Sequence, residues 1–233
     1  ASRASAVTAR SDSSLPVAIF DVTLSNPTDT PVEATVALGL QNIVGWPEIG
    51  ESLNEFVEGD GYRGLLMTTR KHAPEAARFG SLALLTPDEE VTWQLRAAEN
   101  AWFRAGELLM DEFGTTGEFT GPRDPQVSPD GQGDVAHLGI RASLAPGESV
   151  TRTFVLAWMT PNFDHYWGGG ETWKTWQATR WEDALAVGRY VLENLPELES
   201  RTRQFAEAFY SSTLPPYVLD DISSQASILR TPT

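Results

Sequence analysis

The sequence predicts a mainly β protein, an antiparallel β-sandwich followed by a C-terminal α-helical segment. Up to about residue 160, short segments alternate apolar and polar residues, as half-buried strands do. After residue 179 the apolar residues recur every three or four positions, a spacing typical of helices. The 233 residues, of which 41% are hydrophobic, suffice to bury a core. We therefore expect a sandwich at residues 1–160, an aromatic and glycine-rich crossover loop at 161–178, and a helical linker at 179–233.

The first expected strand covers residues 17–25, with Ala18, Phe20, Val22 and Leu24 on one face. Residues 26–31 have turn chemistry and residues 32–41 alternate again, which predicts a hairpin. Further strands are expected at 64–69, 80–86, 91–95, 135–144 and 150–158, separated mostly by turn residues. Such spacing is typical of an antiparallel sandwich. Between them we expect a short helix or irregular excursion at 100–112 and a long surface loop at 114–134, which is rich in Gly, Pro and Asp.

Three apolar stripes define the expected helices. They comprise Ala184, Val187, Val191 and Leu195, then Leu198, Thr202, Phe205 and Phe209, then Val218, Ile222, Gln225 and Leu229. Pro196 and the pair Pro215 and Pro216 are expected to separate them, because proline fits a first helical turn and breaks a helix interior. Each stripe must pack on the sandwich or on a further domain. Without that domain, we expect an exposed apolar patch around Ile222 and Leu229.

Charge and composition exclude several classes of function. A formal net charge of -15 argues against binding a nucleic-acid backbone, which needs clusters of Lys and Arg. No run approaches the roughly 18 apolar residues of a membrane span, and the first residues lack the apolar region of a signal peptide. The absence of cysteine excludes disulfides and thiolate chemistry in this chain. These features favour a soluble, cytoplasmic protein, although export stays open.

No catalytic, metal or cofactor site is predicted. With 32 Asp and Glu residues, adjacent carboxylates are too common to indicate catalysis, and His72, His137 and His165 have no metal-ligand spacing. Neither a Gly-x-Ser-x-Gly elbow nor a Gly-x-Gly-x-x-Gly loop after a strand occurs. Residues 130–134 carry two aspartates among glycines and could cradle calcium. The twelve-residue calcium-loop pattern is missing, however, so we favour an acidic turn.

Aromatic residues in the predicted loops are the better candidates for binding. Tryptophan and tyrosine rings stack on the apolar face of a pyranose, and loops carry most binding residues. The candidate substrate-binding residues are Trp46, His165, Tyr166 and Trp167. Trp173 and Trp176 directly precede the first helix and are expected to anchor the linker to the sandwich instead.

Three segments resemble one family of carbohydrate enzymes. Residues 12–20 read DSSLPVAIF and are followed by SNPTD at 25–29 and by residues 32–42. A second segment has LAPGES at 144–149 and FVLAW at 154–158, and a third has TRWEDAL at 179–185, YVLENL at 190–195 and FYSSTLPPYVLD at 209–220. In this order they resemble the N-terminal domain and linker of glycoside hydrolase family 116, the non-lysosomal glucosylceramidase type of β-glucosidase.

The resemblance implies a non-catalytic role for this chain. The catalytic carboxylates of that family lie in an (α/α)6 domain expected after residue 233, which would be the partner of this chain and would cleave a β-glucoside or glucosylated lipid with retention, without an organic cofactor. The glycine-rich region expected before residue 12 is missing, so the sandwich is expected to lack its first strands. Two alternatives stay open: the N-terminal domain of another sandwich-plus-toroid enzyme, of the phosphorylase or glucoamylase type, and a stand-alone carbohydrate-binding sandwich.

Overall fold

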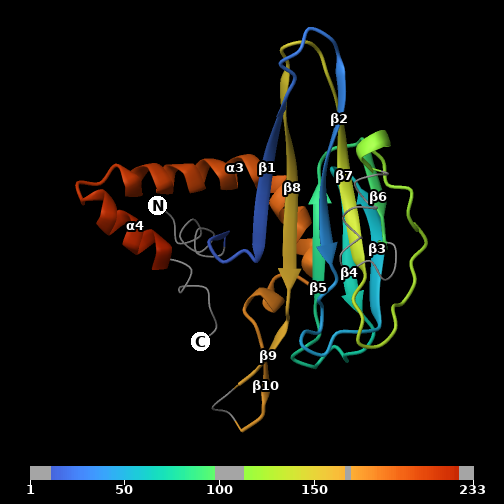
Figure 1. Cartoon of the computed structure of the whole chain (residues 1–233). Coiled ribbons are helices and arrows are strands. Elements are labelled where there is room, and N and C mark those ends of the chain that lie inside the picture. The colour runs from blue at the N-terminus through green and yellow to red at the C-terminus, as the bar shows by residue number, and fades with distance from the viewer. Residues whose placement is uncertain (1–11, 98–112, 166–168, 226–233) are drawn as a thin grey trace. The chain divides into compact units, whose positions relative to one another are not determined.

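The computed structural model describes residues 12–97, 113–165 and 169–225, and it confirms the expected fold class. Strands in antiparallel sheets make up most of the regular structure, and helices follow them (Figure 1). The chain divides into two compact units. We call Pro16–Leu192 the sandwich unit and the residues on either side of it the terminal unit.

The described residues of the sandwich unit form three sheets. The larger sheet has the strand order β1-β8-β5-β4-β3, with β1 at Val17–Ser25, β8 at Ser149–Met159, β5 at Ser81–Thr86, β4 at Tyr62–Thr69 and β3 at Ser52–Gly59. The smaller sheet has the order β2-β7-β6, with β2 at Val32–Gln41, β7 at Val135–Leu144 and β6 at Val91–Gln94. A two-stranded hairpin pairs β9 at Asn162–Asp164 with β10 at Thr172–Lys174.

The core lies between the larger and the smaller sheet. Its fully or almost fully buried members are Leu65, Met67, Leu84, Leu95, Ala136, Leu138, Ile140 and Phe154. They come from β4, β5, β7 and β8 and from the residue after β6, so both inner faces contribute. Side chains alternate between the two faces along a strand, so each strand contributes every second residue to this core.

Both outer faces are covered as well. The first turns of α3, which spans Ala184–Tyr210, pack on the larger sheet, where Val187 and Val191 are fully buried. Gly188 lies so close to this sheet that an added Cβ would approach Leu85 Cδ1 to 2.6 Å. On the smaller sheet, Phe119 covers His137, with ring centroids 5.2 Å apart.

The predicted hairpin of residues 17–41 is wrong, although both strands have the expected bounds. β1 pairs with β8 and β2 pairs with β7, so the two strands belong to different sheets. The turn at residues 26–31 therefore connects the two layers. Asn26 fixes it by donating from its side-chain amide to the carbonyls of Thr30 and Leu144, at 2.8 and 3.1 Å.

Three strands were not predicted, and one predicted break is wrong. β9 and β10 lie in the expected crossover loop, and β3 lies in a stretch for which no element was expected. Pro196 lies inside α3 and does not end it. Proline lacks the N–H for one helical bond and its ring crowds the carbonyl four positions earlier, but α3 continues through the bonds of the neighbouring residues. The excursion expected at residues 100–112 falls outside the described residues.

In the terminal unit, the end of α3 is followed by α4 at Pro216–Gln225. Arg201 Nη1 on α3 binds Asp12 Oδ2 at 2.6 Å and so ties the two ends of this unit together. The helices keep large apolar side chains in solvent, including Phe205 and Tyr217. No helix among the described residues has the length and apolar character required to span a membrane.

Candidate functional site

Exposed tryptophans gather at the end of the sandwich where β2 and β8 finish. Four of the described tryptophans are exposed, namely Trp46, Trp158, Trp173 and Trp176. Trp46 lies in the loop after β2, Trp158 at the end of β8, Trp173 on β10 and Trp176 just after it. We call these residues and the loops that carry them the tryptophan-rich end. An exposed cluster of large apolar side chains is typical of a binding surface.

The loop of Trp46 is held by a buried amide at its start. The Asn42 side chain is fully buried and donates to Asn54 Oδ1 and to the Thr68 carbonyl, both at 2.9 Å. Its own oxygen accepts from the Val44 backbone N–H at 3.1 Å. This anchoring fixes the residues before Trp46, whose own side chain is 70% exposed. The tryptophan is therefore presented to solvent by an ordered loop.

A second loop, residues 70–80, connects the Trp46 loop with the hairpin. His72 Nε2 lies 3.0 Å from the Glu48 carbonyl, and Arg78 Nη2 lies 3.3 Å from Glu48 Oε1. On its other side, the buried Asn162 amide donates to the Pro74 carbonyl at 2.7 Å. Trp46 and β9 thus belong to one connected end of the sandwich.

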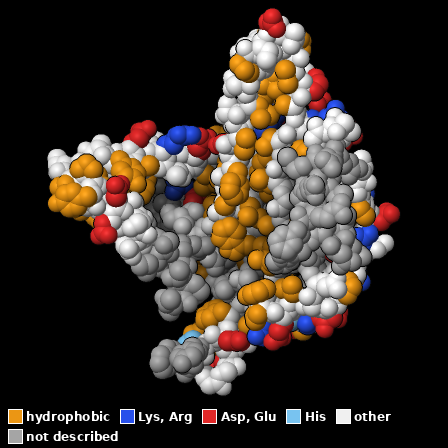
Figure 2. Space-filling view, viewed as in Figure 1, with side chains coloured by type: hydrophobic (Ala, Val, Ile, Leu, Met, Phe, Trp, Pro, Cys, Tyr) orange, Lys and Arg blue, Asp and Glu red, His pale blue; other side chains and the backbone are white. Residues whose placement is uncertain are grey.

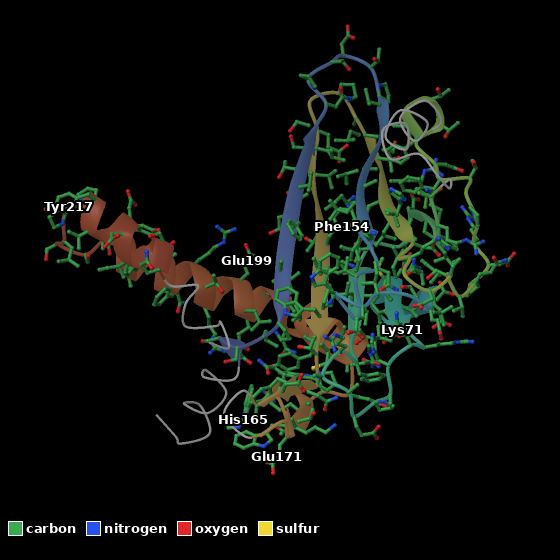
Figure 3. All side chains as sticks on the ribbon, turned by 60° about the horizontal axis from the view of Figure 1, so that its bottom comes forward. Lys71, Phe154, His165, Glu171, Glu199 and Tyr217 are labelled. Atoms are coloured by element: carbon green, nitrogen blue, oxygen red, sulfur yellow. The ribbon has the colours of Figure 1, made fainter. Side chains whose placement is uncertain are left out.

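The hairpin carries the most organised aromatic group. Trp173 faces Phe163 across the two strands, and their rings meet edge to face with centroids 6.3 Å apart. The His165 ring stacks on Trp173 at 3.9 Å with an interplanar angle of 11°. The His165 N–H donates to the Glu171 carbonyl at 2.9 Å, which closes the pair beyond the last ladder residues. Figure 3 shows His165 and Glu171 next to each other on this hairpin.

Polar atoms surround the aromatic stack. Trp173 Nε1 donates to Glu171 Oε2 at 3.3 Å, which leaves the other carboxylate oxygen able to accept from a ligand. His165 Nδ1 is buried and has no hydrogen-bond partner among the described residues. An aromatic face with a carboxylate at its edge suits a sugar, which presents C–H groups on one face and hydroxyl groups around its rim.

Behind the hairpin, an arginine fills the space between three aromatic rings. The Arg180 guanidinium lies 4.4 Å from the Trp181 ring centroid, 5.6 Å from that of Trp176 and 5.8 Å from that of Tyr190. Trp181 is only 9% exposed, so it is the buried tryptophan that attaches this segment to α3. Trp173 and Trp176, expected to be the anchors, are 47% and 48% exposed.

Two of the four predicted binding residues can be placed. Trp46 and His165 lie at the tryptophan-rich end but on separate loops. Tyr166 and Trp167 fall outside the described residues. Trp173 was expected to anchor the linker rather than to bind, because its stacking on His165 depends on the register of a hairpin that the sequence pattern did not reveal.

The titratable groups elsewhere have local roles. Lys71 Nζ bonds Asp130 Oδ1, and this bond and the charge of Lys71 hold the pKa of the Asp130 carboxyl below its usual value. Asp130 begins the acidic turn considered for calcium, so a lysine already binds that carboxylate. Burial lowers the pKa of His137, whose Nδ1 lies 3.0 Å from Gln94 Nε2. A neutral imidazole accepting from the amide fits this geometry.

Comparison with known proteins identifies the family. No curated protein was found to match the chain. A family model described as beta-glucosidase 2, glycosyl-hydrolase family 116 N-term, matches residues 7–198, which is more than half of the chain. The match covers the strands and the first part of α3, in agreement with the resemblance of residues 12–42, 144–158 and 179–195. The chain belongs to the N-terminal domain family of glycoside hydrolase family 116.

Proposed function

We propose that this chain is the non-catalytic N-terminal domain of a retaining β-glucosidase or glucosylceramidase-like hydrolase, where it stabilises the catalytic domain of the same polypeptide and walls part of its active-site entrance. The observation that carries the proposal is the match to the family 116 N-terminal domain over residues 7–198. Hydrolysis with retention needs two carboxyl groups on either side of the scissile bond. In this proposal the catalytic domain supplies both.

The stabilising role is supported by apolar surface on the terminal unit. Phe205 is 72% exposed, Tyr217 is 75% exposed and Ile222 is 45% exposed. A shallow groove on this surface is lined by Phe205, Ala206, Phe209, Tyr210, Ile222 and Ser223. Tyr217 lies near the start of α4 (Figure 3). Burying such side chains against a neighbouring domain contributes about 25 cal/mol per Å².

The role at the entrance is supported by the tryptophan-rich end. Trp46 and the stacked pair of Trp173 and His165 offer flat aromatic surfaces on ordered loops. A neutral sugar or the apolar part of an aglycone can stack on them, and the acidic surface does not repel either. We propose Tyr166 and Trp167, which lie between His165 and Trp173 in sequence, as further members of this wall.

Steady-state kinetics of the whole polypeptide test the entrance role. Trp46→Ala and Trp173→Ala are compared on p-nitrophenyl β-glucoside and on glucosylceramide in detergent. We expect about a tenfold loss of kcat/KM on the lipid, equivalent to about 1.4 kcal/mol of lost binding, and little change on the small glucoside. Ile43→Ala is the control, because Ile43 is exposed in the same loop but has no ring. Unchanged kinetics of both tryptophan variants on both substrates would refute the entrance role.

Thermal inactivation of the same polypeptide tests the stabilising role. The double variant Phe205→Ser with Tyr217→Ser should lower the Tm of the catalytic domain, whereas Gln204→Ser, at an exposed polar position on α3, should not. The isolated chain should also bind an apolar-surface dye through this surface. A wild-type Tm for the double variant would exclude the contact. Specific binding of sugars by the isolated chain would instead favour the stand-alone carbohydrate-binding alternative.

A further inference from the structure

The segment 117–123 runs beside β6 (Figure 1), and we call it the strap. The Phe119 N–H donates to Thr92 Oγ1 on β6 at 2.9 Å, and the Pro122 carbonyl accepts from the Leu95 N–H at 2.8 Å. The Phe119 side chain is buried on the outer face of the smaller sheet. The strap is therefore held on the sheet by backbone bonds to β6 and its neighbour and by one buried ring.

A chain of polar groups also joins the strap to β7. The Gly121 N–H donates to Gln94 Oε1 at 3.2 Å, and Gln94 Nε2 lies 3.0 Å from His137 Nδ1. Both side chains in this chain of groups are buried, so water competes little for the two bonds. Glycine is required at residue 121, because an added Cβ would approach Gln94 Oε1 to 2.2 Å.

The direction of these bonds fixes the protonation state of the imidazole. A backbone N–H can only donate, so the Gln94 atom that faces Gly121 is the amide oxygen. The Gln94 NH2 group then faces His137 and donates to it. Only an unprotonated Nδ1 accepts such a bond, so the closed strap requires a neutral His137 with its proton on Nε2.

The space around the imidazole favours the same neutral form. The ring lies across Gly39 on β2, where an added Cβ would lie 2.8 Å from both Cδ2 and Nε2 of His137. Phe119 on the strap covers the ring, with the centroids 5.2 Å apart. Burial in this way lowers the pKa of His137 below its ordinary value.

Charged groups of both signs occur on the elements around this ring. Among the described residues, they are Glu33 on β2, Arg141 on β7, Glu90 and Arg96 on either side of β6, and Glu118 and Arg123 on the strap. Arg141 Nη1 binds Glu118 Oε1 at 2.8 Å, and the Arg123 guanidinium lies 4.4 Å from the centroid of the Trp93 ring. Figure 2 shows acidic and basic side chains interspersed on this side of the sandwich unit. Burial, and not a neighbouring cation, is thus the cause of the lowered pKa of His137.

We propose that acid opens the strap, because protonation of His137 breaks its bond with Gln94 and releases residues 117–123 from the smaller sheet. A proton taken from solvent at Nδ1 would face the Gln94 NH2 group, and two donors repel each other. Rotation of the amide would satisfy the imidazolium but would turn the NH2 group toward the Gly121 N–H. One of the two bonds is lost in either orientation, and the charged ring gains water when Phe119 moves away.

The sign and size of the effect follow from proton linkage. The open strap binds a proton more tightly than the closed strap, since His137 regains its ordinary pKa of about 6.5 once it is uncovered. The equilibrium constant for opening should therefore rise as the pH falls below about 6.5, by up to about tenfold per pH unit. Between pH 7.5 and pH 5.0 the largest possible rise is about thirtyfold.

Amide hydrogen exchange measured by NMR on the full chain tests the proposal. Protection is expressed relative to an unstructured chain at the same pH, which removes the intrinsic pH dependence of exchange. We expect protection at Phe119 and Gly121 to fall about ten- to thirtyfold from pH 7.5 to pH 5.0. Leu84 on β5, between β4 and β8, reports unfolding of the larger sheet and should stay protected at both pH values. The imidazole nitrogen shifts of His137 should show the proton on Nε2 at pH 7.5.

Three variants assign the response to His137. In Gln94→Glu, a carboxylate can accept from both Gly121 and the imidazole in its charged form, so protection should not fall at pH 5.0. His137→Gln cannot take up a proton and should also lose the pH response. His72→Gln removes a histidine in the loop of residues 70–80, away from the strap, and should keep the full response.

Four outcomes would overturn the proposal. Protection at Gly121 that is equal at the two pH values in the wild type excludes opening by acid, and an equal fall in His137→Gln excludes this histidine as the cause. A proton on Nδ1 of His137, or an unprotected Gly121 amide, at pH 7.5 would show that the closed arrangement does not form. Loss of protection at Leu84 together with Gly121 would mean that the whole sandwich unit unfolds.

Discussion

Replacing Phe154 by alanine should destabilise the sandwich unit by roughly 3–5 kcal/mol, the usual cost of such a change in a well-packed core. Phe154 is fully buried on β8 and belongs to the core between the larger and the smaller sheet. Truncation removes the buried ring and leaves a cavity that the rigid sheets cannot close. Because domains are stable by only about 5–15 kcal/mol, this change takes a large share of the free energy of unfolding.

Phe20→Ala is a matched control for this experiment. Phe20 lies directly opposite Phe154 on the same sheet face but is 42% exposed. A fully buried phenylalanine side chain contributes about 1.5–3 kcal/mol by area, so slightly more than half of that range, about 1–2 kcal/mol, is at stake at Phe20. Water also fills the space that the ring leaves. The two variants should therefore differ by about 2 kcal/mol, roughly thirtyfold in the unfolding equilibrium constant.

Urea unfolding of both variants, followed by tryptophan fluorescence and circular dichroism, measures the difference. The midpoints should separate while the slopes with denaturant stay equal. Equal losses in the two variants would refute the difference in burial between Phe154 and Phe20 from which the prediction is worked. A larger loss for Phe20→Ala would have the same consequence, because Phe20 would then be as well covered as Phe154.

Three further predictions concern buried and paired groups. The pKa of His137 is lowered in the folded state, so its contribution to stability is complete above about pH 6.5 and falls as the pH drops below that value. The urea midpoints at pH 8.0 and 5.5 should therefore differ less in His137→Gln than in the wild type. Gly188→Val should cost about 1–3 kcal/mol by overpacking against the larger sheet, whereas Gly114→Val, where nothing lies within 4 Å of the added Cβ, should show no overpacking loss in the same urea titration. In Lys71→Met the pKa of Asp130, followed by NMR, should rise toward its usual value, and an unchanged pKa would exclude the lysine as the cause.

The strands of the sandwich could be predicted to within a few residues because alternation is a local property. β1, β2 and β7 have the expected bounds. Which strands pair is not local, and the turn at residues 26–31 would suit a hairpin as well as the crossing between sheets that it makes. In the folded chain the Asn26 amide donates to Thr30 within the turn and to Leu144 at the end of β7, a contact that cannot be read from the turn residues alone.

The missed elements have physical reasons too. β3 has polar residues, Ser52 and Asn54, at buried positions, where their side chains donate to the carbonyls of Gln132 and Leu95, so its apolar alternation is weak. Pro196 was expected to end a helix. The apolar positions on both sides of it follow one helical period, and the helix therefore tolerates one missing hydrogen bond.

At the tryptophan-rich end, the exposure of Trp46 could be predicted from the sequence, but the arrangement of the aromatic rings could not. Loop position alone indicated that Trp46 would be accessible. The stack of His165 on Trp173 requires β9 and β10 to pair in one register, and three-residue strands give too little alternation to reveal it. The buried role of Trp181 likewise depends on Arg180, which lies between rings separated in the sequence.

The covered faces of the sandwich limit where this chain can contact a partner. The inner faces of the larger and the smaller sheet pack on each other. The first turns of α3 cover the outer face of the larger sheet, and Phe119 covers part of the outer face of the smaller sheet. Among the described residues of the sandwich unit, the large apolar side chains that stay exposed include the four tryptophans of the tryptophan-rich end. Substitutions inside the covered faces should therefore act through stability. Substitution of Trp173, which is 47% exposed, should leave stability largely unchanged and should act on the kinetics expected for the proposed entrance role.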